Sequence, residues 1–85
     1  MRFLRTRPFL KDYSKLSSAT RKKIDRQLLH LAQDIRHPAL YAKKMTGVGD
    51  IWEARIDEHY RMTFQIQDDV IILRRAGTYE IYRNP

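Results

Sequence analysis

Hydrophobic and polar residues alternate along two consecutive segments near the middle of the chain, residues 52–57 and 60–66. The hydrophobic positions are Trp52, Ala54, Ile56, Tyr60, Met62, Phe64 and Ile66. A period of two is typical of strands with one buried and one solvent-exposed face, so the pattern predicts a β-hairpin. A three-residue connection at residues 57–59 keeps both hydrophobic sets on one face.

This register places two arginines directly opposite each other on the polar face of the hairpin. Arg55 pairs with Arg61, and Glu53 pairs with Thr63. Like charges in such a position destabilise a strand pair. The two guanidinium groups therefore suggest an anion that sits between them, and phosphate is the obvious candidate.

Helical periodicity precedes the hairpin. Pro8 suits a first helical turn, and the hydrophobic residues that follow at helical spacing are Phe9, Leu10, Tyr13 and Leu16. Ser17 and Ser18 interrupt this helix and offer an N-cap to the next. A second, amphipathic helix is predicted from residue 19 to about residue 36, with a stripe formed by Ile24, Leu28, Leu31 and Ile35. His37 precedes a proline, which ends this helix.

Three further segments have strand character. Residues 2–6 predict a short edge strand with Phe3 facing inward, residues 43–47 a short strand or a loop, and residues 70–76 an interior strand. The order of elements predicts a single α+β domain over residues 1–85. In this two-layer fold, the N-terminal strand and a helical hairpin pack on one face of a mainly antiparallel sheet, and the other face is open.

The register of the last strand decides which arginine joins the polar face. A two-residue turn pairs Phe64 with Leu73 and Thr63 with Arg74, which brings Arg74 to that face. A one-residue slip would bring Arg75 there instead. The remaining residues, 78–85, form a tail.

Composition and charge narrow the classes of partner. The net charge of +7 is uneven, because residues 1–46 hold twelve Lys/Arg against three Asp/Glu and residues 47–85 hold five against seven. A basic chain suggests a nucleic acid, although an acidic protein partner fits the charge equally well. The chain has no cysteine, no signal-peptide core and no apolar run near the roughly 20 residues needed to cross a bilayer, so we expect a cytoplasmic protein.

The polar face holds the residue types that RNA cleavage without a metal requires. Such a reaction needs a base for the ribose 2′-hydroxyl and cations that stabilise the phosphorane. Glu53 could be the base, and the arginines at 55, 61 and 74 could stabilise the charge. The alternative is an ordinary solvated face with Glu–Arg pairs.

Histidines, tyrosines and lysines supply weaker signals. We expect His30 to be partly buried beside the apolar stripe, His37 to cap the C-terminus of the second helix and His59 to be solvated in the turn. No pair of histidines has metal-ligand spacing. Tyr79 and Tyr82 could stack on bases or bond a 2′-hydroxyl. Lys43 and Lys44 could contact the RNA backbone or simply be solvated.

In its ordered motifs the chain resembles the RelE/ParE superfamily of toxins. The motifs are KDYSKL, HPALYAKKMTG, the hairpin from IWEARI to HYRMTFQI, and DDVIILRRAGTYE. The resemblance implies a four-stranded sheet with two helices, a small cognate antitoxin as partner, and, in the RelE branch, metal-independent cleavage of mRNA in the ribosomal decoding site.

The resemblance also assigns roles to residues. Arg61 follows Tyr60 as an arginine follows an aromatic residue or histidine in the RelE branch, and the terminal tyrosine corresponds to Tyr82. Glu53 stands where members carry a basic residue, and Tyr79 stands where a catalytic arginine or histidine is expected. These departures leave two alternatives: a ParE-like inhibitor of DNA gyrase, or a catalytically weak homologue that acts through antitoxin binding.

The preferred hypothesis is a toxin of a type II toxin–antitoxin system that acts as an mRNA endoribonuclease at the ribosome and inhibits translation. The catalytic candidates are Arg61, Arg55, Glu53, Tyr79 and Tyr82. The RNA-binding candidates are Lys43, Lys44, Arg74, Arg75 and Arg83. No metal or cofactor is expected.

Overall fold

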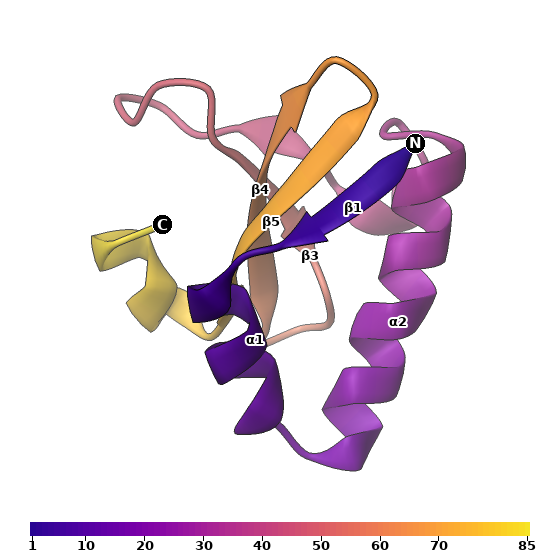
Figure 1. Cartoon of the computed structure of the whole chain (residues 1–85). Helices are drawn as coiled ribbons and strands as arrows, with labels where there is room; N and C mark the ends of the chain where they lie inside the picture. Colours follow the sequence, from indigo (N-terminus) through magenta and orange to yellow (C-terminus); the bar gives the residue numbers. More distant parts are fainter.

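The computed structural model describes all residues from Met1 to Pro85. Strands, helices and two short 3₁₀ helices follow one another along the chain (Figure 1) as β1 (Arg2–Arg5), α1 (Arg7–Ser14), α2 (Ser18–Gln33), η1 (Pro38–Leu40), β2 (Lys43–Lys44), β3 (Trp52–Arg55), β4 (Arg61–Gln67), β5 (Val70–Gly77) and η2 (Tyr79–Arg83). Neither α-helix combines the length and the apolar character that a membrane span requires.

The strands form one sheet in the order β1-β5-β4-β3-β2. Only the β1–β5 pair is parallel, and the other pairs are antiparallel. The α+β class and the mainly antiparallel sheet are therefore confirmed, but the expected count of four strands is wrong. The fifth strand, β2, exists because the loop with positive φ at Gly47 and Gly49 turns the chain back, so that Lys43 pairs with Glu53.

Both helices begin as the sequence predicts, but the second ends early. Thr6 and Ser17 cap α1 and α2, with side-chain oxygens that accept from the N–H groups of Phe9 and Thr20. Helix α2 stops at Gln33 instead of near residue 36. The Asp34 carboxylate accepts the N–H of Arg36 at 2.9 Å, which offers the backbone a bond outside the helix.

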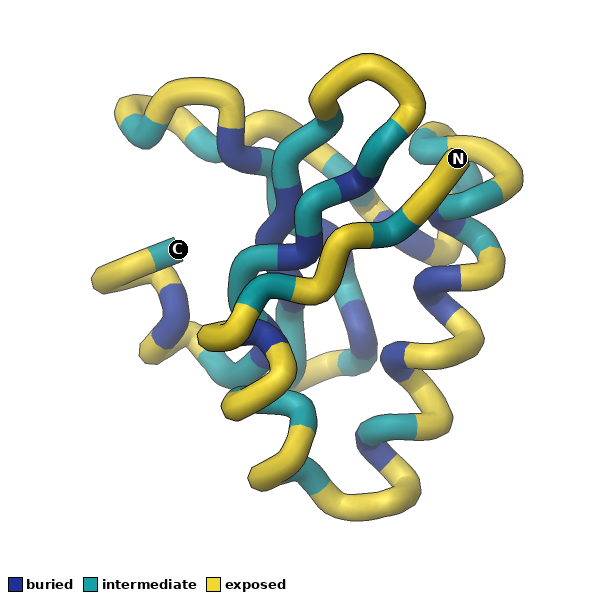
Figure 2. Tube along the Cα trace, in the orientation of Figure 1, coloured by how far each residue is buried: buried dark blue, intermediate teal, exposed yellow.

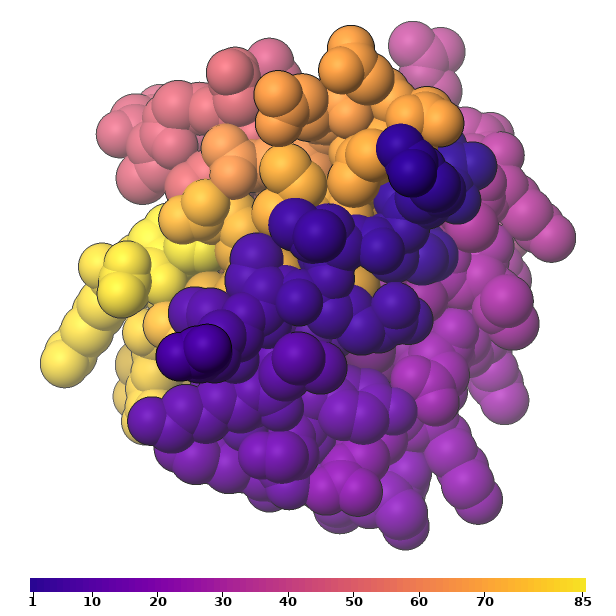
Figure 3. Space-filling model, in the orientation of Figure 1, coloured from indigo at the N-terminus to yellow at the C-terminus, as the bar shows by residue number.

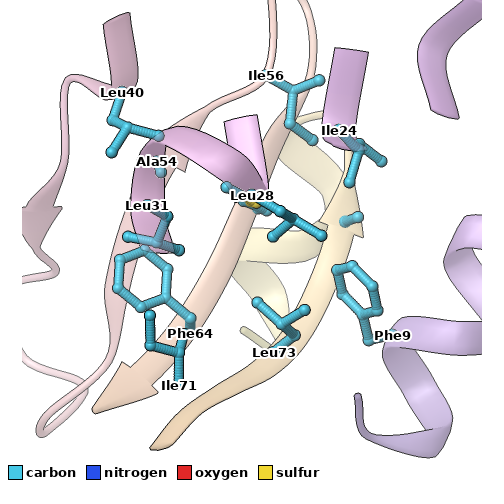
Figure 4. Close-up of a cluster of buried hydrophobic side chains, with 12 residues drawn as sticks. Phe9, Ile24, Leu28, Leu31, Leu40, Ala54, Ile56, Phe64, Ile71 and Leu73 are labelled. Carbon is cyan, nitrogen blue, oxygen red and sulfur yellow. The ribbon is translucent and has the colours of Figure 1, made fainter. Parts of the chain in front are cut away.

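The helices and the inner face of the sheet enclose the hydrophobic core. Figure 1 shows α2 on one side of the sheet and the C-terminal segment on the other. Buried positions recur along the inward side of α2 and along the central strands (Figure 2). The core cluster (Figure 4) consists of Phe9, Ile24, Leu28, Leu31, Leu40, Ala54, Ile56, Met62, Phe64, Ile71, Leu73 and Ala76.

The hairpin of β3 and β4 has the predicted register. Arg55 lies opposite Arg61 and Glu53 opposite Thr63, and the Ile56 N–H donates to the Tyr60 carbonyl at 2.9 Å. Buried Ala54 and Met62 point into the core. Since side chains alternate along a strand, the residues at 53, 55, 61 and 63 share the outer face.

The β4–β5 pair combines the two registers that the sequence left open. Phe64 pairs with Leu73 as expected, but Thr63 pairs with Arg75, because a β-bulge at Arg74 inserts one extra residue. The predicted pairing of Thr63 with Arg74 is therefore wrong.

The outer face is not fully open, which corrects a further expectation. The tail folds back as η2 and places Ile81, only 3% exposed, against the sheet at Gly77. A Cβ atom at Gly77 would lie 2.9 Å from the Ile81 Cγ2 atom, so the close approach depends on the missing side chain. We call residues 78–85 the C-terminal strap.

Candidate active site

The outer face of the hairpin forms one wall of a surface pocket beside β2. The pocket has a volume of about 450 Å³ and is lined by Tyr41, Ala42, Lys43, Glu53, Arg55 and Arg61. Three strands meet here, because Lys43 pairs with Glu53 and Arg55 with Arg61. The structure therefore brings Arg55, Arg61 and Glu53 to one site together with Lys43.

The two arginines have different partners within the protein. The Arg61 Nη1 atom donates to the carbonyl oxygens of Asp57 at 2.5 Å and Tyr60 at 2.9 Å. The Arg55 guanidinium lies over the Tyr41 ring, 5.4 Å from its centroid. These contacts give each guanidinium a partner within the protein, which stabilises the two facing cations. Neither arginine forms a salt bridge, so both positive charges are available to a ligand.

Glu53 is the carboxylate of the pocket. Its side chain is only 17% exposed, and the Lys43 ammonium lies 4.0 Å from its Oε1 atom. The Tyr82 hydroxyl donates to the same oxygen over 3.5 Å. A carboxylate in this position can accept a proton, and the phenol and the ammonium restrict its orientation.

Tyr82 reaches the pocket from the strap and is a proton donor there. Partial burial raises the pKa of Tyr82, the negative charge of Glu53 raises it further, and the nearby Arg61 opposes the shift. The phenol is therefore protonated at neutral pH. It can donate a hydrogen bond to Glu53 or to a ligand oxygen.

Arg74 and Arg75 hold the strap rather than line the pocket. Arg74 Nε donates to the Pro85 carbonyl oxygen at 3.1 Å, and the Thr63 hydroxyl donates to the same oxygen at 2.8 Å. Arg75 Nη1 donates to the Asn84 carbonyl oxygen at 3.0 Å. Through these bonds, β4 and β5 set the position of the strap that carries Tyr82.

The other predicted site residues lie outside the pocket. Lys44 forms a salt bridge of 3.5 Å with Asp50 and packs over the Trp52 ring. Tyr79 is 76% exposed and Arg83 is exposed, and neither lines the pocket.

The histidines are placed away from the pocket. His59 is exposed in the hairpin turn, as expected. His37 does not cap α2, which corrects the sequence prediction. Because α2 ends at Gln33, the His37 Nδ1 atom instead accepts the N–H of Ala39 and caps η1, and its ring stacks on that of half-buried His30 at 3.8 Å. No group of three or more His, Asp or Glu side chains is arranged to hold a metal ion.

Tyr41 lines the pocket, although it is not among the predicted site residues. It lies just after η1 with a positive φ of 48°, and it is 68% exposed. An aromatic residue two positions before the Lys43-Lys44 pair was the available signal. Its place under the Arg55 guanidinium depends on the loop that leads into β2.

The chain matches no family model and no curated protein, but it is similar to solved structures of toxins. The toxin in the RelB–RelE antitoxin–toxin complex from Methanococcus jannaschii is 25% identical over 96% of this chain and 99% of that chain, with a TM-score of 0.77. The YoeB/ParE toxin from Agrobacterium tumefaciens is 13% identical, covers 93% and 99% of the two chains, and has a TM-score of 0.81. YafQ from E. coli strain BL21(DE3) is 12% identical, covers 96% and 98%, and has a TM-score of 0.80. The chain therefore has the fold of the RelE/ParE superfamily of toxins, as the sequence resemblance implied.

Proposed function

We propose that the protein is the toxin of a type II toxin–antitoxin system and cleaves mRNA at the ribosome in the cytoplasm without a metal ion. The observation that carries this proposal is the pocket of about 450 Å³ in which two arginines without carboxylate partners face the partly buried Glu53. A concave site with a partly buried carboxylate and guanidinium groups that have no carboxylate partner suits a phosphodiester and a proton transfer.

Each pocket residue has a different role in the proposed phosphodiester cleavage. Glu53 takes the proton from the ribose 2′-hydroxyl, and the 2′-oxygen attacks phosphorus. Arg61, which is fixed by two carbonyls, and Arg55 stabilise the negative charge of the phosphorane. The bond from phosphorus to the 5′-oxygen breaks, and the leaving oxygen takes a proton from Tyr82, the protonated phenol of the site. The products are a 2′,3′-cyclic phosphate and a 5′-hydroxyl.

Residues around the pocket contact the flanking RNA in this proposal. Lys43 lines the pocket and can meet a phosphate beside the scissile one. Lys44 packs over Trp52 and pairs with Asp50, so it can contact only RNA that extends beyond the pocket. Tyr79 and Arg83 are exposed on the strap, where a base or a phosphate can reach them. Arg74 and Arg75 act on the RNA indirectly, through the strap that they hold.

The proposed regulator is a small antitoxin protein. The similar RelE toxin from M. jannaschii was solved in complex with its antitoxin RelB. A chain with a net charge of +7 suits an acidic partner of this kind.

The Arg61→Ala variant tests the nuclease proposal. We expect cleavage of mRNA on programmed ribosomes, followed by primer extension, to fall about 10²- to 10³-fold, because one charge-stabilising group is lost. Arg36→Ala removes an exposed arginine outside the pocket and serves as the matched control. Thermal unfolding of both variants checks that the hairpin is intact.

A ParE-like inhibitor of DNA gyrase is the second candidate, since a YoeB/ParE toxin shares the fold with a TM-score of 0.81. If the wild-type protein cuts no mRNA on ribosomes but blocks supercoiling by purified gyrase, the nuclease proposal is wrong and this alternative holds.

A further inference from the structure

One side of α1 and its C-cap carry a row of cations away from the candidate active site. Arg7, Lys11 and Lys15 follow one another at intervals of four residues and are all exposed. Side chains four residues apart on a helix lie about 5–6 Å from each other, and like charges at this spacing destabilise the helix slightly. Folding alone does not favour such a row.

The row borders a hollow in the surface. A pocket of about 370 Å³ is lined by Arg7, Pro8, Lys11, Asp12, Lys15 and Arg75. An adjoining pocket of about 240 Å³ shares Pro8 and Arg75 with the first and adds Thr6, Arg74, Asn84 and Pro85. Figure 3 shows the surface of α1 next to the C-terminal strap on this side of the molecule.

The carboxylate in this hollow does not neutralise the row. Both Asp12 oxygens are engaged by Arg75, at 2.6 Å and 3.2 Å, and one of them also accepts the N–H of Ala76. The Asp12 hydrogen bond raises the pKa of Arg75, which therefore stays charged. None of Arg7, Lys11 and Lys15 takes part in a salt bridge, so the larger pocket has a lining charge of four cations against one carboxylate.

The cations near the start of α2 differ because the fold uses several of them. Arg21 donates to the carbonyl oxygens of Tyr13 and Ser14, and Lys23 pairs with Asp57 at 3.1 Å. Lys22 and Arg26 are exposed at the same four-residue spacing, but they line none of the main pockets. They provide an internal reference for a basic helix face without a hollow.

The lining indicates the chemical class of the ligand. Apart from Pro8 and Pro85, the residues that line the two pockets are polar or charged. Protein–protein interfaces have an apolar core, whereas interfaces with nucleic acids are more polar and strongly positive. Guanidinium and ammonium groups in a row suit the repeating phosphates of a nucleic-acid backbone.

We propose that the groove between α1 and the C-terminal strap, lined by Arg7, Lys11, Lys15 and Arg75, is a second binding site for an RNA backbone. It borders the same strap that carries Tyr82 to Glu53, since Pro85 lines the smaller pocket and accepts a bond from Thr63 of the outer face. The choice of RNA over DNA rests on the proposed function. The site binds RNA beyond the cleaved nucleotides. It increases the affinity for RNA and takes no part in the cleavage step.

The test compares Lys11→Gln/Lys15→Gln with the matched control Lys22→Gln/Arg26→Gln, which removes the same charge from α2. The probe is a fluorescent single-stranded RNA with methylated 2′-hydroxyls, which cannot be cleaved, and its affinity is measured by anisotropy over a range of salt. Loss of two phosphate contacts lowers the slope of log K against log salt by about 1.4 and the affinity about 25-fold at roughly 0.1 M salt. The control variant retains nearly the wild-type values.

Three outcomes overturn the proposal. If both double variants lost the same affinity for the RNA probe, binding would depend only on the net charge of the protein. A DNA strand that binds as tightly as the RNA, with the same loss in the α1 variant, would refute the choice of RNA. If Lys11→Gln/Lys15→Gln bound RNA like the wild type but no longer bound poly-glutamate, the groove would be a site for an acidic protein.

Primer extension on programmed ribosomes, run in parallel, separates this proposal from the nuclease. If the wild-type protein cleaves no mRNA, the proposed function is wrong. A loss of affinity for the methylated RNA in Lys11→Gln/Lys15→Gln alone would still support the groove as an RNA site.

Discussion

The two faces of the sheet belong to the same strands but have different roles, one in folding and one in the candidate site. The inner face presents Ala54, Met62 and Phe64 to the helices, and each is fully buried. The outer face presents Glu53 and Arg61 at neighbouring positions, and only the C-terminal strap covers part of it. The inner face contributes stability through burial, while the outer face keeps cations without carboxylate partners.

The difference shows how one alternating pattern separates stability from binding. An inner position tolerates little change of volume, because the core is close-packed. An outer position tolerates polar replacement unless the side chain orients a neighbour. Substitutions on the two faces should therefore produce different kinds of defect.

The largest effect on stability is expected from Phe64→Ala on the inner face. Phe64 is fully buried and packs beside Trp52, with ring centroids 6.2 Å apart. Removing the ring leaves a cavity and should lower the free energy of unfolding by about 3–5 kcal/mol, measured by urea denaturation. Gln67→Ala, at an exposed position on the same strand, should change it by less than about 0.5 kcal/mol. Similar costs for both variants would contradict the separation of the faces.

On the outer face, Glu53→Gln should impair chemistry and spare stability. The amide keeps the size of the side chain and an acceptor for Tyr82, but it cannot take a proton. Under the proposed mechanism, cleavage on programmed ribosomes should fall about 10²- to 10⁴-fold, while the urea midpoint changes little. A variant that cleaves at the wild-type rate would remove Glu53 from the reaction.

Gly77→Ala should disturb the link between the sheet and the strap. The new Cβ would lie 2.9 Å from the Ile81 Cγ2 atom, so the strap must shift, at a cost of about 1–3 kcal/mol in the free energy of unfolding. A double-mutant cycle with Ile81→Ala checks the cause, because the clash disappears in that background. An identical cost in both backgrounds would show that Ile81 is not the clashing partner.

The smallest effect concerns the hairpin turn and depends on pH. Burial alone would raise the pKa of Asp57, but bonds from the N–H groups of His59 and Tyr60 and from Lys23 outweigh it and lower the pKa below the ordinary value of 3.8. A lowered folded-state pKa stabilises the fold above about pH 4 and loses this contribution as the pH falls through the folded-state value.

Asp57→Asn keeps an acceptor for the turn but loses the charge. We expect it to reduce the free energy of unfolding by about 1 kcal/mol at pH 7. The difference from wild type should shrink when urea denaturation is repeated below pH 4. A constant difference across this range would show that the charge of Asp57 is not involved.

The hairpin and the C-terminal strap mark how far the sequence could predict the site. Alternation with a period of two permits few registers for the hairpin. In these registers Glu53, Arg55 and Arg61 lie on the same face, so the sequence alone predicted their common face. The places of Arg74 and Arg75 did not follow, since a bulge can occur at any of several positions and its cost depends on neighbouring strands. The end of α2 was missed because Asp34 bonds the backbone outside the helix.

The sequence by itself determined the α+β class, the hairpin register and the collection of Glu53, Arg55 and Arg61 on one polar face, because these depend on local periodicity. Only the tertiary structure decided that the outer face is partly covered and that Tyr82 meets Glu53. It also decided that the row of cations on α1 borders a hollow. These features depend on contacts between segments far apart in the chain, such as Gly77 with Ile81 and Thr63 with Pro85, for which no periodic pattern exists.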